Sequence, residues 1–429
     1  MNWKNDYKSK LTSATEAVKA IKSGDRVVTG HACAEPQDLI AAMVARKDEL
    51  KNVEIVHMVA MGSADYTNEE MEGHFHHNAL FVGASTRKAI KENRADYTPS
   101  FFFEIPELFK NNHLKVDVAM IQLSKPDKHG YCSYGVSVDY TKAAAEKADI
   151  VIAEVNENMP RTHGSNIHIS ELDHIIESDN EIIELPNPEI GEVEKNIGEN
   201  VAKLIENGST LQLGIGAIPD AVLTFLKDKK NLGIHSEMIS DGVVDLVKEG
   251  VINNSKKTLN PGKIIVTFLM GTKKLYNFID DNPIVQVLPV DYTNNPTIIG
   301  QNDKLVSINS AVEVDFMGQV SAETIKGNQI SGVGGQVDYV RGASFSNGGK
   351  AIIALPSTAG NGKYSRIVPE LDSGTPVTTS RNDVHYIVTE YGVANLKGKT
   401  LKDRAKELIK ISHPDFRDEL KEKFNKIYN

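Results

Sequence analysis

The sequence has little cysteine and no long apolar run. Among its 429 residues, Cys33 and Cys132 are the two cysteines, and they lie far apart. Such a pair makes neither a disulfide framework nor a zinc ligand set, so we expect a reducing, cytoplasmic setting. The start MNWKNDYKSK is polar and lacks the apolar core of a signal peptide. Because no apolar run is long enough to span a bilayer, we predict a soluble protein with no membrane partner.

An excess of positive charge is also missing. The formal net charge is −10, 25% of the residues are charged, and lysine and arginine are scattered rather than gathered into a stripe. This distribution argues against nucleic acid as a partner. Histidine is present, but the HFHH run at 74–77 shows no strong metal-ligand spacing, so we predict no metal site.

The chain length and the pattern of apolar residues predict the fold class. With 40% hydrophobic residues, the chain exceeds one ordinary core, so two domains are expected. Apolar, β-branched runs alternate with amphipathic stretches, which is typical of α/β proteins whose mainly parallel sheets are covered by helices. The predicted strands lie at 26–30, 53–59, 79–83, 116–123, 149–155, 211–215, 264–270, 304–309, 351–355 and 386–390. The predicted helices lie at 38–50, 140–148, 219–229, 240–249, 271–280 and within 400–429.

The pattern of the first half restarts in the second. Residues 20–43 and 204–226 each contain a helix end, a Gly turn, a strand, a Gly at the strand end, then Pro and an apolar helix. The segment KNVEIVH (51–57) is likewise echoed by KNLGIH (230–235). These echoes favour two copies of one α/β unit, although unrelated βα units with the same rhythm are the alternative.

The segment LPNPEIGE (185–192) is typical of a linker between the two halves. We therefore predict two similar open α/β/α domains, 1–185 and 186–429. Open α/β sheets bind ligands beyond the carboxyl ends of their strands, so we expect the active site in the cleft between the domains.

Two glycine-rich segments in the second half are candidate ligand-binding elements. GIGAIPDAV (214–222) follows a strand and opens a helix, so its backbone N–H groups can meet a phosphate. It lacks the third glycine of a dinucleotide fingerprint, and an ordinary turn is the alternative. SGVGGQVDYVRGA (331–343) has four glycines and a strand-like VDYV, and its N–H groups can serve as an oxyanion hole. A flexible surface loop is the alternative there.

Glu237 stands out in GIHSEMISDGVVD (233–245), between a predicted strand and a predicted helix. No cysteine accompanies this acid, and His235 does not give a metal-ligand spacing with it. These residues alone favour a surface or helix-capping acid.

Taken together, several motifs resemble the acetyl-CoA hydrolase/transferase family of class I CoA-transferases. Within that family, the chain most resembles the 4-hydroxybutyrate and butyryl-CoA:acetate CoA-transferases. The resemblance extends into the first half and covers nearly the whole chain. The motifs are LQLGIGAIPDAV, GIHSEMISDGVVD, DYTNNP (291–296), INSAVEVDFMGQV (308–320), SGVGGQVDYVRGA, SRIVP (365–369), VTTSRNDV (377–384), VTEYGVA (388–394), LSKPDKHGYCSYGVSVDYTKAA (123–144) and AEVNENMP (153–160).

The resemblance implies a covalent role for Glu237. In this family the matching glutamate attacks an acyl-CoA to give an acyl-glutamyl anhydride, and CoA then returns to form a glutamyl thioester. CoA is thus a substrate and a covalent intermediate, and no permanently bound cofactor is expected. The expected partners are acyl-CoA and short carboxylic acids, and base rates favour a homodimer or homotetramer. An acyl-CoA hydrolase on the same scaffold and a nucleotide-binding module without catalysis are the alternatives.

The resemblance also implies the roles of further residues. Gly335 would donate its N–H to the oxyanion, and Glu390 would orient groups near the nucleophile, with Arg381 beside it. A structural ion pair is the alternative for Glu390, and a solvated surface lysine for Lys363. The residues expected to contact CoA are Gly214, Ile215, Gly216, Ala217, Ile218, Asn294, Gly335 and Lys363. The residues of the first half that could line the acyl pocket are Gly30, His31, Glu35, Tyr131 and Cys132, with an ordinary packing role as the alternative for His31.

Overall fold

The computed structural model describes residues 3–428, which form two compact units. The first unit contains the described residues up to Leu185 together with Ile265–Thr293 and Gln329–Gly332. The second contains Pro186–Ile264, Asn294–Asn328 and the described residues from Val333 onward. The first stretch of the first unit ends at Leu185, and residues 265–293, from later in the chain, also belong to this unit. The segment 265–293 packs with the first unit because its backbone bonds there, for example from Leu185 N–H to the Gly271 carbonyl at 2.9 Å.

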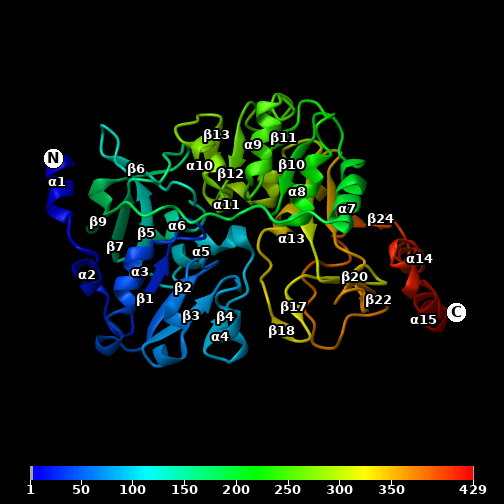
Figure 1. Cartoon of the computed structure of the whole chain (residues 1–429), viewed down its shortest axis with the longest axis horizontal. Helices are drawn as coiled ribbons and strands as arrows, with labels where there is room; N and C mark the ends of the chain where they lie inside the picture. The colour runs from blue at the N-terminus through cyan, green and yellow to red at the C-terminus, as the bar shows by residue number, and fades with distance from the viewer. Residues whose placement is uncertain (1–2, 429) are drawn as a thin grey trace. The chain divides into compact units, whose positions relative to one another are not determined.

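The first unit is built on a seven-stranded sheet in which every neighbouring pair is parallel. The chain starts in the middle at β1, adds β2 to β4 on one side and then β5, β7 and β9 on the other (Figure 1). The switch point of this doubly wound sheet lies between β1 and β5. In spatial order the strands are β4 (Ala95–Tyr97), β3 (Phe75–Ala79), β2 (Val53–His57), β1 (Arg26–Thr29), β5 (Val118–Ser124), β7 (Ile150–Asn156) and β9 (His174–Ser178).

The central strands of this sheet are buried along nearly their whole length. All of β5 is buried, and so is β7 after its first residue. Parallel sheets that are covered on both faces need such continuous apolar strands. The segments VAMIQL and IVIAEV can therefore be recognised as strands from the sequence. The helices of this unit are α1 (Trp3–Lys10), α2 (Ala14–Ala17), α3 (Gln37–Val44), α4 (Arg87–Lys91), α5 (Ile105–Lys110), α6 (Thr141–Lys147), α10 (Lys273–Ile279) and α11 (Val290–Thr293).

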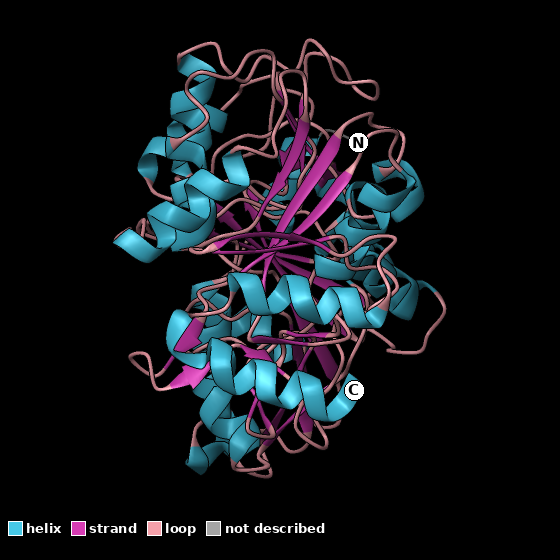
Figure 2. Cartoon of the chain, turned by 90° about the vertical axis from the view of Figure 1, so that its right-hand side faces the viewer, coloured by secondary structure: helices cyan, strands magenta, loops and turns pink. Residues whose placement is uncertain are grey.

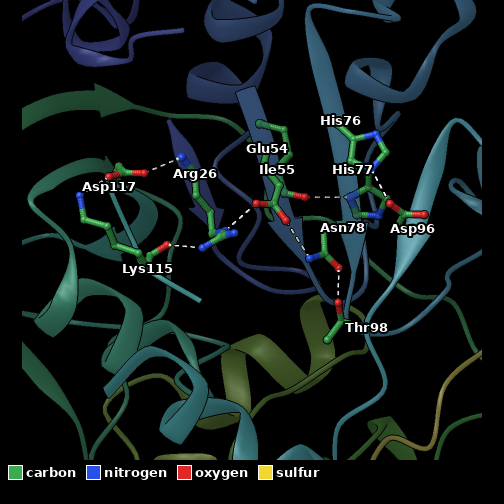
Figure 3. Close-up of polar contacts among 10 residues, drawn as sticks. All are labelled: Arg26, Glu54, Ile55, His76, His77, Asn78, Asp96, Thr98, Lys115 and Asp117. Atoms are coloured by element: carbon green, nitrogen blue, oxygen red, sulfur yellow. Dashed lines mark hydrogen bonds and ion pairs between the residues drawn. The ribbon is translucent and has the colours of Figure 1, made fainter. Parts of the chain in front are cut away.

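Strand β3 corrects one prediction, because it spans FHHNA at 75–79 rather than the apolar ALFVG at 79–83. Its polar residues fit a sheet since neighbouring strands satisfy them. The His77 Nδ1 atom lies 3.1 Å from the Ile55 carbonyl, and the Asn78 amide donates to Glu54 at 2.8 Å (Figure 3). Glu54 also accepts a hydrogen bond from the Arg26 guanidinium at 2.6 Å, and Thr98 donates to Asn78 at 2.8 Å. The polar chain therefore runs from β1 across β2 and β3 to Thr98, the residue that follows β4.

The second unit contains a six-stranded sheet in which five consecutive strands repeat the strand order of part of the first sheet. In space the strands are β11 (Gly233–Ile234), β10 (Thr210–Leu213), β14 (Leu305–Ser310), β19 (Lys350–Ala354), β23 (Tyr386–Thr389) and β24 (Gly392–Asn395). All neighbours are parallel except the β23–β24 hairpin. The order β11-β10-β14-β19-β23 repeats the order β2-β1-β5-β7-β9, so the switch point here lies between β10 and β14.

Helices flank the strands in each unit, as Figure 2 shows in cyan and magenta. In the described chain, the longest helix has 12 residues, and none has the length and apolar character needed to cross a membrane. The helices of the second unit are α7 (Glu192–Ala202), α8 (Ala217–Thr224), α9 (Asp241–Lys248), α12 (Pro296–Ile299), α13 (Gln336–Phe345), α14 (Leu401–Ile411) and α15 (Arg417–Tyr428). The short strands outside the two large sheets are β6 (Tyr131–Ser133), β8 (Asn166–His168), β12 (Ile264–Val266), β13 (Val285–Val287), β15 (Glu313–Asp315), β16 (Val320–Ser321), β17 (Thr324–Ile325), β18 (Asn328–Gln329), β20 (Thr358–Ala359), β21 (Tyr364–Ser365) and β22 (Ile367–Val368).

Helix α13 corrects a second prediction, because VDYV is helical rather than strand-like. Its β-branched and aromatic residues favour a strand by propensity, but propensity is overridden by packing. Tyr339, Val340 and Ala343 recur at helical spacing and are buried in the core of the second unit with Ile353 and Leu408. The glycines before the helix therefore form its N-terminus.

Candidate active site

Glu237 lies at the carboxyl edge of the second sheet, three residues after β11 and four before α9. Its side chain is half-buried. The preceding residue, Ser236, is fully buried, and its hydroxyl donates to the Leu213 carbonyl at 3.1 Å and accepts from the Leu213 N–H at 3.2 Å. Met238 pairs with Leu213 as an isolated β-bridge. These contacts fix the backbone on both sides of Glu237 against the end of β10.

Gly335 lies directly against the Glu237 carboxylate. A Cβ atom at position 335 would lie 1.9 Å from Glu237 Oε2 and 2.9 Å from its Cδ, so no side chain fits there. Gly335 is also the N-cap of the ten-residue helix α13. The N-terminus of a helix carries a partial positive charge and unpaired N–H groups, which favour an anion at this position.

Asn294 is fully buried and holds the Glu237 carboxylate from another direction. Its Nδ2 group donates long hydrogen bonds to Glu237 Oε2 at 3.4 Å and to Asp338 Oδ2 at 3.3 Å. The Tyr339 hydroxyl donates to Asn294 Oδ1 at 3.4 Å, which fixes the orientation of the amide. Burial, reinforced by the charges of Glu237 and Asp338, raises the pKa of Tyr339 well above its ordinary value, so the phenol remains a donor.

The glycine loop at 214–218 begins one residue after Leu213, next to the backbone that carries Glu237. Gly216 has φ +110° and caps the N-terminus of α8, a conformation that favours glycine. Ile215 is 46% exposed, whereas Ile218 is buried. The Ser240 hydroxyl donates to Asp220 Oδ1 at 2.9 Å and ties the start of α9 to α8. The loop is therefore an open backbone surface beside the candidate nucleophile.

Glu390 lies at the end of β23 in the same sheet, and its carboxylate is held by Ser357. It accepts the Ser357 N–H at 2.9 Å and the Ser357 hydroxyl at 2.5 Å. Burial lowers the pKa of the Arg366 guanidinium, and the charges of Glu313 and, less strongly, Glu390 oppose this shift. Arg381 is exposed and its guanidinium lies 3.1 Å from the Met317 sulfur. Lys363 is exposed.

The candidates of the first unit are mostly buried. His31 is 1% exposed, and its Nδ1 atom lies 2.9 Å from the buried Asp139 carboxylate. The Glu35 carboxylate accepts the N–H groups of Met61 and Gly62, each at 3.0 Å. Burial raises the pKa of Glu35, while these two hydrogen bonds oppose the shift. Glu35 lines a hollow of about 670 Å³ that also borders α3.

The two cysteines are buried. Burial raises the pKa of Cys132 to about 12 and that of Cys33 to about 11. Both thiols are therefore protonated at neutral pH, which argues against a thiolate nucleophile. Tyr131, beside Cys132, is exposed. His235 contacts the Asn302 amide at 3.3 Å, and no group of three or more His, Cys, Asp or Glu side chains within residues 3–428 could hold a metal ion.

The sequence missed several residues that support the site. Ser236, Asp338 and Tyr339 lie inside the motifs listed above, and Ser357 lies between two of them, but nothing in their spacing shows which partner each one contacts. Arg366 is part of SRIVP, and it donates to the carbonyls of Thr358, Ala311 and Val312 at 3.1 to 3.2 Å. These contacts join segments that are far apart in sequence, so only the folded chain shows them.

Comparison with known proteins identifies the family. The N-terminal domain model of the acetyl-CoA hydrolase/transferase family matches residues 1–185, and its C-terminal domain model matches residues 271–424. A 4-hydroxybutyrate coenzyme A transferase of Clostridium kluyveri is 64% identical over 99% of this chain and 100% of its own. A butyryl-CoA:acetate CoA-transferase of Anaerostipes caccae is 43% identical over 98% and 97% of the two chains.

A solved structure agrees with these matches. The 4-hydroxybutyrate CoA-transferase of Porphyromonas gingivalis superimposes with a TM-score of 0.87 and 46% identity, covering 99% of this chain and all of that one. The predicted α/β fold and the predicted family are confirmed. The chain belongs to the acetyl-CoA hydrolase/transferase family.

Proposed function

We propose that this enzyme transfers CoA from a short-chain acyl-CoA to a free carboxylate, with Glu237 as the nucleophile. The observation that carries the proposal is the contact between the Glu237 carboxylate and Gly335 at the N-terminus of α13. Relatives of 43% to 64% identity that are matched over nearly the whole chain carry the name of CoA-transferases, which supports transfer as the reaction.

The proposed reaction has two half-reactions. A Glu237 oxygen attacks the thioester carbonyl, the C–S bond breaks, and an acyl-glutamyl anhydride and a CoA thiolate form. The thiolate attacks the glutamyl carbonyl, releases the first carboxylate and leaves a glutamyl-CoA thioester. A second carboxylate reverses both steps and leaves as the new acyl-CoA. An anhydride is about as activated as a thioester, so a carboxylate nucleophile conserves the bond energy without ATP.

Each attack in this scheme develops negative charge on a carbonyl oxygen. We assign Gly335 the backbone donor for that oxyanion, because its side-chain-free position adjoins the Glu237 carboxyl group. Asn294, supported by Tyr339 and Asp338, would hold the carboxylate at the attack angle. Glu390 would maintain the neighbouring strand end through Ser357.

The CoA substrate is proposed to bind along the glycine loop Gly214–Ile218. The loop opens α8, whose N-terminal N–H groups suit a phosphate or a pantetheine amide. Ile215 offers an exposed apolar side chain at the same place. Lys363 is proposed as a contact for a CoA phosphate, and its exposure is compatible with that role. Asn294 keeps its proposed CoA contact in addition to its position beside Glu237.

The proposed acid substrate is 4-hydroxybutyrate, with acetyl-CoA or butyryl-CoA as donor. The 64% identical relative named as a 4-hydroxybutyrate transferase supports this choice, and butyrate with acetate is the alternative that the 43% identical relative supports. For the assembled enzyme we propose a homodimer or homotetramer in the cytoplasm.

The test is a kinetic comparison of acid acceptors. CoA esters formed from butyryl-CoA are separated by chromatography with acetate, 4-hydroxybutyrate or no acid present. Transfer predicts new CoA esters with both acids and parallel double-reciprocal plots, as expected for a ping-pong reaction. Release of free CoA at the same rate with and without acid would contradict transfer and identify a hydrolase.

A further inference from the structure

The strand that leads to the proposed nucleophile, β11, lies at the edge of the second sheet and has only two residues. On its inner side, the N–H groups of Gly233 and His235 donate to the residue before β10 and to β10 itself, at 2.9 and 3.1 Å. Because successive residues of a strand turn their peptide groups to opposite sides, the N–H and the carbonyl of Ile234 point to the open edge. Ile234 is fully buried, so both groups need partners other than water.

Two side chains take the place of a further strand at this edge. Asn254 Oδ1 accepts the Ile234 N–H at 2.9 Å, and the Lys257 ammonium donates to the Ile234 carbonyl at 2.7 Å. We call the side chains of Asn254 and Lys257 the edge clamp. Both residues belong to the second unit and are at most 5% exposed. An edge strand presents N–H and carbonyl groups without strand partners, and the edge clamp binds both of these groups at Ile234.

The lysine of the edge clamp is itself held in place. Its ammonium also donates to the Lys263 carbonyl at 2.8 Å, so its two acceptors are main-chain carbonyls. Gly233 leaves room for the lysine stem, because a Cβ atom at position 233 would overlap it and lie 2.9 Å from Lys257 Cδ. Burial lowers the pKa of Lys257 to about 7, but a neutral amine still has one N–H group for each carbonyl. The contact therefore persists whether or not the amine is protonated.

The link from the edge clamp to the nucleophile is short. Three residue steps separate Ile234 from Glu237 and span at most about 11 Å when extended. The two residues between them, His235 and Ser236, are fully buried, and Ser236 is bonded to Leu213 on the inner side. The segment is thus held from the inner side by β10 and from the outer side by the edge clamp. A displacement of Ile234 has little slack in which to be absorbed before it reaches Glu237.

We propose that Lys257 and Asn254 are positioning residues for the transfer reaction, which hold β11 from its open edge so that the Glu237 carboxylate stays in place for attack. The proposal rests on the proposed function of Glu237, and every contact that carries it lies inside the second unit. Because a 1 Å misplacement near the reacting atoms can cost about 100-fold in rate, a clamp behind the nucleophile can control the chemical step. In this role, neither side chain touches the substrate.

The experiment measures both the rate constant and the amplitude of CoA-adduct formation on the full-length enzyme at pH 7, with saturating butyryl-CoA and no acceptor acid. Lys257→Met removes the donor and keeps an unbranched apolar stem. Asn254→Gly removes the acceptor and tolerates the φ of +57° at this position, whereas Asn254→Asp keeps an acceptor and tests for rescue. The matched control is Lys256→Met, at the exposed neighbouring position.

The two readouts separate positioning from a purely structural role. Partial unfolding lowers the amplitude of adduct formation, whereas a misplaced nucleophile in folded enzyme lowers the rate constant. We expect rate constants about 5-fold to 100-fold lower in Lys257→Met and Asn254→Gly, the range that small misplacements cause, with an unchanged KM for butyryl-CoA. Asn254→Asp should recover most of the rate, and Lys256→Met should match the wild type.

Unchanged rate constants in both Lys257→Met and Asn254→Gly, or losses confined to amplitude, KM or Tm, would overturn the proposal. If Lys257→Met yields no folded protein, the comparison of Asn254→Gly with Asn254→Asp decides the question alone. If the wild-type enzyme forms no adduct on Glu237, the proposed function itself fails, and that result is distinct from the others.

Discussion

The two large sheets share the order of five consecutive strands, but the loops at their switch points differ. In the first unit, the loop after β1 is closed, and its residues His31, Cys33 and Glu35 are at most 2% exposed. In the second unit, the corresponding loop after β10 is open, with partly exposed glycines and an Ile215 that is 46% exposed. The loop that follows the corresponding strand therefore has buried side chains in the first unit and accessible backbone in the second.

The segments after β2 and β11 show the same contrast. His57 is the last residue of β2 and His235 directly follows β11, and both are fully buried. Two residues later the first unit has Val59 and the second has Glu237. The Val59 carbonyl accepts a backbone hydrogen bond from Ala32 at 3.1 Å, so this place in the first unit supports the closed loop. The comparison teaches that two sheets with the same strand order can differ at one corresponding place, where only the second unit has an acid, the proposed nucleophile Glu237.

Among the variants proposed here, Glu237→Gln is expected to have the largest effect on activity, because it removes the acid that only the second unit has at this place. The amide cannot form the anhydride, so kcat for CoA transfer should fall by about 10⁴-fold or more. Steady-state transfer from butyryl-CoA to acetate measures the loss. Glu249→Gln is the control, since Glu249 caps α9 and pairs at the surface with Lys227. Activity retained in Glu237→Gln would mean that the nucleophile lies elsewhere.

Replacing Gly335 by Ala tests the open geometry around the proposed nucleophile. The new Cβ would overlap Glu237 Oε2, so either the carboxylate or the N-terminus of α13 must move. Loss of one oxyanion donor typically costs about 100-fold to 1,000-fold in kcat, and we expect a loss of that size. The control is Gly83→Ala in the first unit, where the nearest atom would lie at an ordinary 3.6 Å. Equal kcat values in the two variants would remove Gly335 from the proposed machinery.

Lys257 supports the strand that leads to Glu237 and predicts a pH dependence of stability. Its ammonium donates to the Ile234 and Lys263 carbonyls at 2.7 and 2.8 Å, and burial lowers the pKa of Lys257 to about 7. An unfolded lysine titrates near pH 10.4, so between pH 7 and 10 the unfolded state binds more protons and stability rises with pH. This rise amounts to at most about 1.4 kcal/mol per pH unit.

The variant Lys257→Met should lose that part of the rise. Urea unfolding at pH 7, 8 and 9 gives the free energy of unfolding, and the difference between wild type and variant should grow with pH in favour of the wild type. Lys256→Met is the control at an exposed neighbouring position. Parallel curves for the wild type and Lys257→Met would show that the buried ammonium does not titrate in this range.

The variant Ile215→Ala has the smallest expected effect on activity, and it tests only the open loop at 214–218. Truncation to Ala removes apolar surface that CoA would cover, which should raise the KM for butyryl-CoA about 3-fold to 10-fold and leave the Tm unchanged. Phe225→Ala, at the other end of α8 with a 38% exposed side chain, is the control. An unchanged KM in Ile215→Ala would place the CoA path away from this loop.

The sequence predicts the parts of the fold that depend on local patterns. Hydrophobic periodicity identifies the buried strands at the centre of both sheets. Periodicity together with residues typical of a helix start identifies the helices α3, α8 and α9. It fails at β3, where His77 and Asn78 depend on partners in neighbouring strands, and at α13, where core packing overrides the strand propensity of VDYV.

For the candidate site as well, the sequence predicts some residues, whereas only the folded chain shows their contacts. Glu237 and Gly335 were visible as motif residues, and the folded chain brings them into contact with each other and with Asn294. The pairing of Glu390 with Ser357 was not visible, because these residues lie 33 positions apart. The charge of Glu390 acts on the pKa of Arg366, and the Arg381 guanidinium contacts the Met317 sulfur; the spacing of these residues in the sequence shows neither relation.

The most direct test of the central claim is the mass of the intact enzyme after mixing with butyryl-CoA in the absence of an acceptor acid. The account predicts a CoA-sized increase that maps to the peptide containing Glu237, disappears when acetate is added, and is missing in Glu237→Gln. Rapid transfer without any adduct, or an adduct on a peptide from another part of the chain, would contradict it.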